Sequence, residues 1–142
     1  MKTSARNEFT GVIHALIPGS VNTEVVLDIG KGQQLVAIIT NESVVELGLA
    51  IGVTALALIK APWVIVMAEN TPIKTSARNR LCGVVSVCEA GAVNGEVVMT
   101  LDGGHELAAI ITQGSMQGLG LKPGVRVCAL IKSSHIVIAV VV

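Results

Sequence analysis

The first half of the chain contains five short segments dominated by Val, Ile, Leu and Ala, separated by turns rich in Gly, Pro or polar residues. Apolar runs of this length between turn residues are typical of β-strands. The segments cover residues 9–17, 24–29, 35–40, 53–60 and 64–68. Between the third and fourth, Ser43-Val44-Val45-Glu46 resembles a helix capping box and Gly48 a helix stop. We therefore expect five strands and one short helix within 41–49.

This pattern occurs twice in the chain. Residues 3–7, Thr-Ser-Ala-Arg-Asn, recur as 75–79, and the displacement of 72 residues then holds without a gap. About 29 of the 66 aligned positions are identical, which indicates a repeat architecture. We expect two units, 1–68 and 73–142, joined near 69–72. Five strands with a helix before the fourth predict an all-β fold of two tandem five-stranded OB-like barrels, each with one short helix.

Composition limits the function classes. Hydrophobic residues make up 51% of the chain, charged residues 14%, and the formal net charge is zero, which excludes intrinsic disorder. With Phe9 and Trp63 as the only aromatic residues and no basic surplus, the chain lacks the features of a general nucleic-acid binder. No apolar run reaches the roughly 18 to 20 residues of a membrane span, and no secretory signal is visible. We expect a cytoplasmic protein that does not bind a membrane.

The three cysteines, Cys82, Cys88 and Cys128, are odd in number and lack metal-type spacing. They align with Thr10, Leu16 and Leu56 of the first unit, so we expect reduced thiols that pack as small apolar residues. Direct cation ligands are therefore not expected.

The polar residues that recur in both units are mostly hydrogen-bond donors. Six of the ten basic residues recur, but only two of the ten acidic residues, Glu24 and Glu96. The recurring donors are Lys2/Lys74, Thr3/Thr75, Ser4/Ser76, Arg6/Arg78, Asn7/Asn79, Asn22/Asn94, Thr40/Thr112, Ser43/Ser115 and Lys60/Lys132. Donors with one or two cations suit a proton-free dianion such as sulfate, molybdate or tungstate, helped by backbone N–H groups at turns and a helix start. The alternative is that these positions are turn and strand-end residues retained from a duplication.

The same residues carry a resemblance to a known family. Thr-Ser-Ala-Arg-Asn with Gly-x-Val, then Gly-x-Val-Asn-x-Glu-Val, Ala-Ile-Ile-Thr-x-x-Ser, Leu-Gly-Leu and Leu-Ile-Lys-Ala-Pro-Trp-Val together resemble the molybdate-binding Mop domain. Two such units resemble a two-repeat molbindin of the ModG type. The resemblance implies an OB-like barrel, molybdate or tungstate as the bound ligand without an organic cofactor, and a homotrimer in which six Mop units form a ring.

The resemblance also implies the oxyanion ligands, which would lie between neighbouring units. They correspond to Ser4, Arg6, Thr40, Ser43, Lys60 and Ala61, and to Ser76, Arg78, Thr112, Ser115, Lys132 and Ser133. The family's arginine acts through its backbone N–H in one interpretation. A second kind of site, on the three-fold axis, would use Gly19, Ser20, Val21 and Asn22, and Gly91, Ala92, Val93 and Asn94. The second unit has Ser133-Ser134-His135 where the first has Ala61-Pro62-Trp63, which leaves open whether the two halves bind equally.

Catalysis is not expected. Asp102, His105 and Ser76 could be written as a triad, but the first unit lacks equivalents of the first two. For Glu24 and Glu96 an ion pair across a unit interface is the favoured role. We expect intracellular binding, storage and homeostasis of molybdate or tungstate, with no nucleic-acid partner. The alternatives are an OB-type module that binds oligonucleotide or oligosaccharide, and a purely structural β-assembly.

Overall fold

The computed structural model describes residues 3–142, and its two halves contain the same order of elements. In the first half these are β1 (Asn7–Pro18), β2 (Asn22–Gly30), β3 (Gln33–Thr40), α1 (Asn41–Glu46), β4 (Thr54–Ile59), the 3-10 turn η1 (Ala61–Trp63) and β5 (Ile65–Ala68). In the second half they are β6 (Asn79–Glu89), β7 (Asn94–Leu101), β8 (Glu106–Thr112), α2 (Gln113–Gly118), β9 (Arg126–Ile131), η2 (Ser133–His135) and β10 (Val137–Ala139). The all-β prediction is confirmed, including the short helix before the fourth strand of each half.

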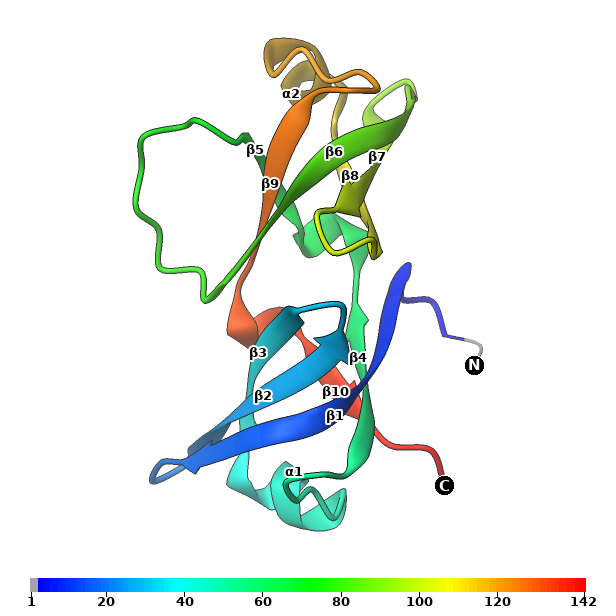
Figure 1. Ribbon diagram of the computed structural model, residues 1–142. Coiled ribbons are helices and arrows are strands. Elements are labelled where there is room, and N and C mark those ends of the chain that lie inside the picture. Colours follow the sequence, from blue (N-terminus) through cyan, green and yellow to red (C-terminus); the bar gives the residue numbers. More distant parts are fainter. Residues whose placement is uncertain (1–2) are drawn as a thin grey trace.

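The two five-stranded sheets exchange their last strands. One sheet has the order β10-β4-β1-β2-β3 and the other β5-β9-β6-β7-β8. The antiparallel register pairs Val137 with Leu58 in the first sheet and Ile65 with Leu130 in the second. Figure 1 shows β5 leaving the first half to lie beside β9, and β10 returning from the second half to lie beside β4. Each sheet therefore contains four strands of one sequence repeat and one strand of the other, which the repeat pattern did not predict. The division into units 1–68 and 73–142 stays a prediction about sequence repeats.

The strand exchange gives the chain a shared interior. One cluster of buried apolar side chains includes Ile13 and Ala57 of the first half and Val85 and Ala129 of the second. In the strands the alternate residues point inward, which is the period-2 pattern expected of a barrel wall. Gly11 lies where β1 crosses β2 so closely that a Cβ atom would overlap the carbonyl oxygen of Asp28, and Gly83 repeats this crossing.

Helix α1 begins three residues earlier than an N-cap at Ser43 would place it. Thr40, not Ser43, is the N-cap of α1, because its Oγ1 accepts a hydrogen bond from the Ser43 N–H. The predicted stop is confirmed: Gly48 has a φ of 64°, and the Leu49 N–H donates to the Val44 carbonyl oxygen, as in a Schellman motif.

The cysteine prediction is wrong for two of the three residues. Cys82 and Cys128 are joined by a disulfide, although 46 residues separate them in the sequence. Antiparallel pairing of β6 with β9 places them directly opposite each other, a relation that spacing along the chain does not reveal. Cys88 is the free thiol, and burial raises its pKa.

Candidate functional site

The recurring Thr and Ser residues form the same hydrogen-bonded pair at the start of both helices. The hydroxyl of Thr40 donates to Ser43 Oγ at 2.8 Å, and that of Thr112 donates to Ser115 Oγ at 2.9 Å. In each pair the serine N–H donates to the threonine Oγ1 at 3.1 Å. Because the threonine proton is used within the pair, the serine keeps its own O–H for a ligand.

The recurring arginines form ion pairs with the recurring glutamates. Arg6 contacts Glu96 at 3.0 Å, and Arg78 contacts Glu24, so each pair joins one repeat to the other. The prediction of an ion pair across the unit interface is confirmed. The carboxylates balance the charge of the guanidinium groups, and each arginine residue also has a backbone N–H that it can donate to a ligand.

Asn7 and Asn79, which follow these arginines, hold the two halves together. The Asn7 side chain donates to the Ala108 carbonyl oxygen at 2.8 Å and accepts from the Ala108 N–H at 2.7 Å. Asn79 makes the equivalent pair with Val36 at 2.8 and 2.7 Å. Each amide thus pairs with an edge strand of the opposite sheet as a peptide group would. In the sequence both residues are recognisable only as recurring donors, whereas the structure shows that both are buried.

The recurring lysines each begin a 3-10 turn. Lys60 is the N-cap of η1 and Lys132 of η2, with φ and ψ of −72° and 132° and of −66° and 132°. The turn therefore keeps its backbone conformation although Ser134 replaces Pro62. Within residues 3–142 neither lysine forms an ion pair with another side chain, and both are exposed. Lys2 lies outside the described residues.

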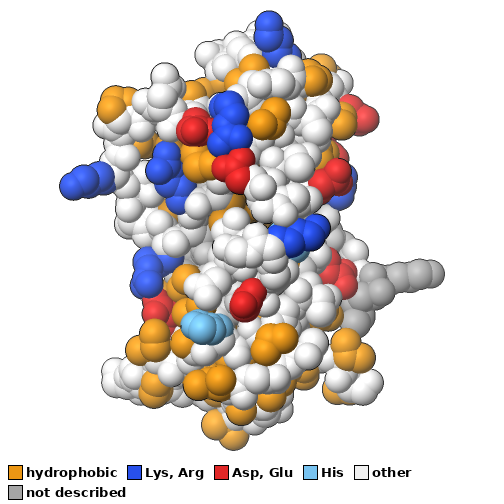
Figure 2. Space-filling model, in the orientation of Figure 1, with side chains coloured by type: hydrophobic (Ala, Val, Ile, Leu, Met, Phe, Trp, Pro, Cys, Tyr) orange, Lys and Arg blue, Asp and Glu red, His pale blue; other side chains and the backbone are white. Residues whose placement is uncertain are grey.

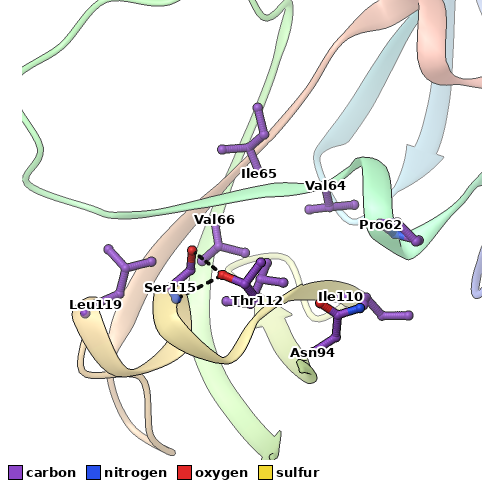
Figure 3. A pocket seen from close by; sticks show the side chains of 11 residues that line it. Pro62, Val64, Ile65, Val66, Asn94, Ile110, Thr112, Ser115 and Leu119 are labelled. Atoms are coloured by element: carbon purple, nitrogen blue, oxygen red, sulfur yellow. Dashed lines mark hydrogen bonds between the residues drawn. The ribbon is translucent and has the colours of Figure 1, made fainter. Parts of the chain in front are cut away.

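Four of the six residues of the second predicted set line two cavities. The larger, of about 640 Å³, contains Thr112 and Ser115 together with Asn94 and the apolar residues of β5 and β8. Figure 3 shows the hydroxyl pair beside Val66, with Ile65 and Pro62 farther along the wall. The smaller cavity, of about 270 Å³, is lined by Ser76 and Lys132 together with Trp63 and His135, whose rings lie 4.9 Å apart. One chain therefore does not bring the hydroxyl pair and the lysine of this set into one cavity.

The remaining predicted residues differ in their burial. Ala61 and Ser133 are buried at the first position of their 3-10 turns, and Ser4 is exposed before β1. The predicted three-fold turns are exposed, with Val21 and Val93 among the most exposed apolar side chains. The first turn is fixed by Asn41, whose Nδ2 donates to the Gly19 carbonyl oxygen at 2.9 Å. In the second half Gln113 replaces Asn41, and its Oε1 is buried without a hydrogen-bond partner among the described residues.

Basic and acidic side chains are mixed on the surface of the protein. Figure 2 shows Lys and Arg side chains interspersed with Asp and Glu across the middle and upper part of one face. Residues 3–142 contain no group of three or more His, Cys, Asp or Glu side chains that could hold a metal cation. In the same residues, no helix is long and apolar enough to cross a membrane. The predicted site residues supply hydroxyl, amide and ammonium donors.

Comparison with known families matches the TOBE domain twice, at residues 3–66 and 75–138. The chain belongs to the TOBE domain family. The two TOBE domains are of the Mop type, in agreement with the resemblance noted from the sequence. Both matches end within the strand that is exchanged, so each family match contains β-strands of two sheets.

Several relatives of this tandem TOBE chain are known. The crystal structure of the cytoplasmic molybdate-binding protein ModG with molybdate bound has 45% sequence identity, covers 99% of this chain and 100% of that one, and gives a TM-score of 0.95. The molybdenum-pterin-binding protein MopA of Rhodobacter capsulatus is 42% identical over 139 residues, which is 98% of this chain and 52% of MopA. The molybdenum transport protein ModE of Azotobacter vinelandii is 41% identical over 140 residues, 99% of this chain and 52% of ModE. The chain spans about half the length of these curated relatives.

Proposed function

We propose that this protein binds molybdate, and that it stores the oxyanion in the cytoplasm. The observation that carries the proposal is the likeness to molybdate-bound ModG over the full length of both chains. The recurring donors agree with that ligand: a serine O–H, a lysine ammonium and backbone N–H groups occur in both halves, and none of them needs a proton on the anion.

Tungstate belongs to the same proposal. Molybdate and tungstate are tetrahedral dianions that present four acceptor oxygens to donors, so hydrogen bonding alone does not separate them. Phosphate near neutral pH carries a proton and needs an acceptor, which this donor set does not supply. We therefore propose molybdate and tungstate as ligands, without an organic cofactor and without catalysis.

The complete site is proposed to form between chains. The hydroxyl pair of Thr112 and Ser115 lies in one cavity, and Ser76 with Lys132 in another, so a single chain offers two half-sites. A neighbouring copy can place its Lys132 half against the hydroxyl half of the first. This supports the homotrimer implied by the Mop resemblance, with the exposed turns containing Asn22 and Asn94 meeting on its axis.

We propose storage and homeostasis of the oxyanion as the role of this binding. ModE relatives include proteins described as transcriptional regulators, of which the chain covers about half. The net charge of zero and the two aromatic residues give no support to nucleic-acid binding by the part present here. Buffering of the free oxyanion concentration requires only reversible binding.

Calorimetric titration with molybdate, tungstate and sulfate, combined with native mass spectrometry, tests the proposal. We expect saturable binding of molybdate and tungstate at micromolar concentration. The expected count is two ligands per subunit at the sites between units, with additional ligands at the axial sites, each of which three subunits share. Lys60→Ala combined with Lys132→Ala should weaken binding while the far-UV circular dichroism spectrum and the oligomer mass are unchanged. Absence of saturable molybdate binding by the wild type refutes the function. Unchanged affinity in the double variant refutes the ligand set.

A further inference from the structure

Three sulfur-containing side chains form a row across the outer face of the second sheet. Met67 on β5 is paired with Cys128 on β9, and Cys128 is paired with Cys82 on β6, to which it is bonded. These residues and Leu130 form an apolar cluster separate from the main interior, with Ala77 packed against it. In the first sheet the equivalent row is Ala139, Leu56 and Thr10, which contains no sulfur. The sulfur row is therefore a feature of one half only.

The sulfur row lies next to the smaller cavity. Side chains at every second residue of a strand share a face, so Cys128 and Leu130 point outward in line, and Lys132 follows directly after β9. Leu130 and Ala77 belong to the cluster and also line the cavity that contains Ser76 and Lys132. The disulfide thus joins the strand that precedes Lys132 to the strand that follows Ser76.

We propose that the Cys82–Cys128 disulfide is a reversible redox switch. The oxidised form raises the oxyanion affinity of the sites to which Lys132 contributes and leaves the affinity of the sites to which Lys60 contributes unchanged. This inference rests on the proposed molybdate binding. With the bond intact, β6 and β9 cannot move apart, so Ser76 and Lys132 are held in place before the ligand arrives. After reduction the two sulfurs must separate to non-bonded contact, and Ala77 and Leu130, which pack on them, must shift. Loss of preorganisation lowers affinity without removing any ligand group.

The chemistry requires a dithiol reductant, of small-molecule or protein origin. Its thiolate attacks Cys82 Sγ, because Cys82 is partly exposed whereas Cys128 is fully buried. The sulfur–sulfur bond breaks, and Cys128 leaves as a thiolate that takes up a proton. The second thiol of the reductant then attacks the mixed disulfide, which releases Cys82 as a thiol and leaves the reductant as a disulfide. Two electrons and two protons are transferred in total, and oxidation by a disulfide reverses the exchange.

The test compares two single-lysine variants in both redox states. Lys60→Ala keeps the sites that Lys132 serves, and Lys132→Ala keeps those that Lys60 serves. Molybdate isotherms are recorded for oxidised protein and after dithiothreitol, with the disulfide monitored by intact mass. Both variants carry Cys88→Leu, which copies Leu16 and removes the third thiol. We expect reduction to weaken binding at least about threefold in the Lys60→Ala protein and not at all in the Lys132→Ala protein.

A matched control copies the first repeat. In Cys82→Thr with Cys128→Leu, each new residue is the one already accommodated at the equivalent position, Thr10 and Leu56, and dithiothreitol should then have no effect on the isotherm. Equal isotherms for oxidised and reduced Lys60→Ala protein would overturn the inference, as would loss of the circular dichroism spectrum on reduction, which would make the bond structural only. If oxidised wild-type protein binds no molybdate, the proposed function itself fails.

Discussion

Removal of the Asn7 side chain tests how the two halves are held together. In the folded protein this amide joins β1 to Ala108, on the edge strand β8 of the other sheet. Asn7 is 4% exposed and Ala108 2%, so water does not readily replace the lost partner. Asn7→Ala therefore leaves the N–H and the carbonyl oxygen of Ala108 without their hydrogen bonds.

The magnitude follows from those two backbone groups. A buried donor or acceptor that loses its partner costs about 1–3 kcal/mol, so the variant should lose about 2–6 kcal/mol of unfolding free energy. Asn79→Ala breaks the equivalent pair with Val36, which is only partly buried. Because water can reach Val36 more easily, we expect a smaller loss for Asn79→Ala than for Asn7→Ala.

Urea denaturation followed by far-UV circular dichroism measures both losses, with Asn70→Ala in the exposed linker as a control that should stay within about 0.5 kcal/mol of the wild type. Asn7→Asp provides a second, pH-dependent test, because its carboxylate faces the Ala108 and Ile59 carbonyl oxygens. That environment raises the folded-state pKa of the new carboxyl group. The added destabilisation should then be full above the folded pKa and vanish as the pH falls below about 4, the unfolded value. An Asn7→Ala protein that unfolds at the wild-type urea concentration would refute the conclusion that this amide holds the two halves together.

Three further predictions concern other parts of the fold. Gly83→Ala places a Cβ against the Thr100 carbonyl oxygen, so we expect urea denaturation to show a loss of about 1–3 kcal/mol in unfolding free energy. Gly104→Ala causes no such overlap with backbone atoms, but Gly104 has a φ of 103°. That variant should be destabilised only through its dihedral angle. Burial raises the pKa of Cys88, so its alkylation by iodoacetamide at pH 8 should be slower than that of a free cysteine, and equal rates would contradict the burial. Hydrogen bonds from Arg126 lower the pKa of Asp102, so Arg126→Ala should raise that pKa in a carboxyl-resolved NMR titration. In the wild type the Asp102–Arg126 interaction contributes to stability above pH about 4, and this contribution is lost as the pH falls through the lowered pKa.

The sequence predicted the elements well because short apolar runs bounded by turn residues determine them locally. The expected segments 9–17, 24–29 and 35–40 fall within β1, β2 and β3, and 53–60 covers β4. The helix was expected from a capping box, but Thr40 is the N-cap. A threonine three residues before a serine offers the same backbone bond, and the pattern alone did not separate the two starts.

The exchange of β5 and β10 could not be predicted from the repeat. Both segments carry the same apolar pattern, so pairing with either fourth strand buries similar side chains. In the structure the three-residue turns η1 and η2 lie between the fourth strand of each repeat and the strand that is exchanged, and this long-range pairing is not specified by the local pattern. The Cys82–Cys128 bond was missed for a related reason, because it depends on the register between β6 and β9 rather than on spacing.

The recurring charged residues of the candidate site differ in whether they form ion pairs. Sequence comparison of the halves indicated that bases recur while acids vary. The two acids that do recur, Glu24 and Glu96, pair with the recurring arginines, so these four residues contribute no net charge to a ligand. Among the recurring bases at the predicted sites, Lys60 and Lys132 remain without an ion pair within the described chain. An incoming dianion would therefore meet one uncompensated ammonium group per repeat, surrounded by neutral donors, and its affinity should depend on the lysines far more than on the arginine side chains.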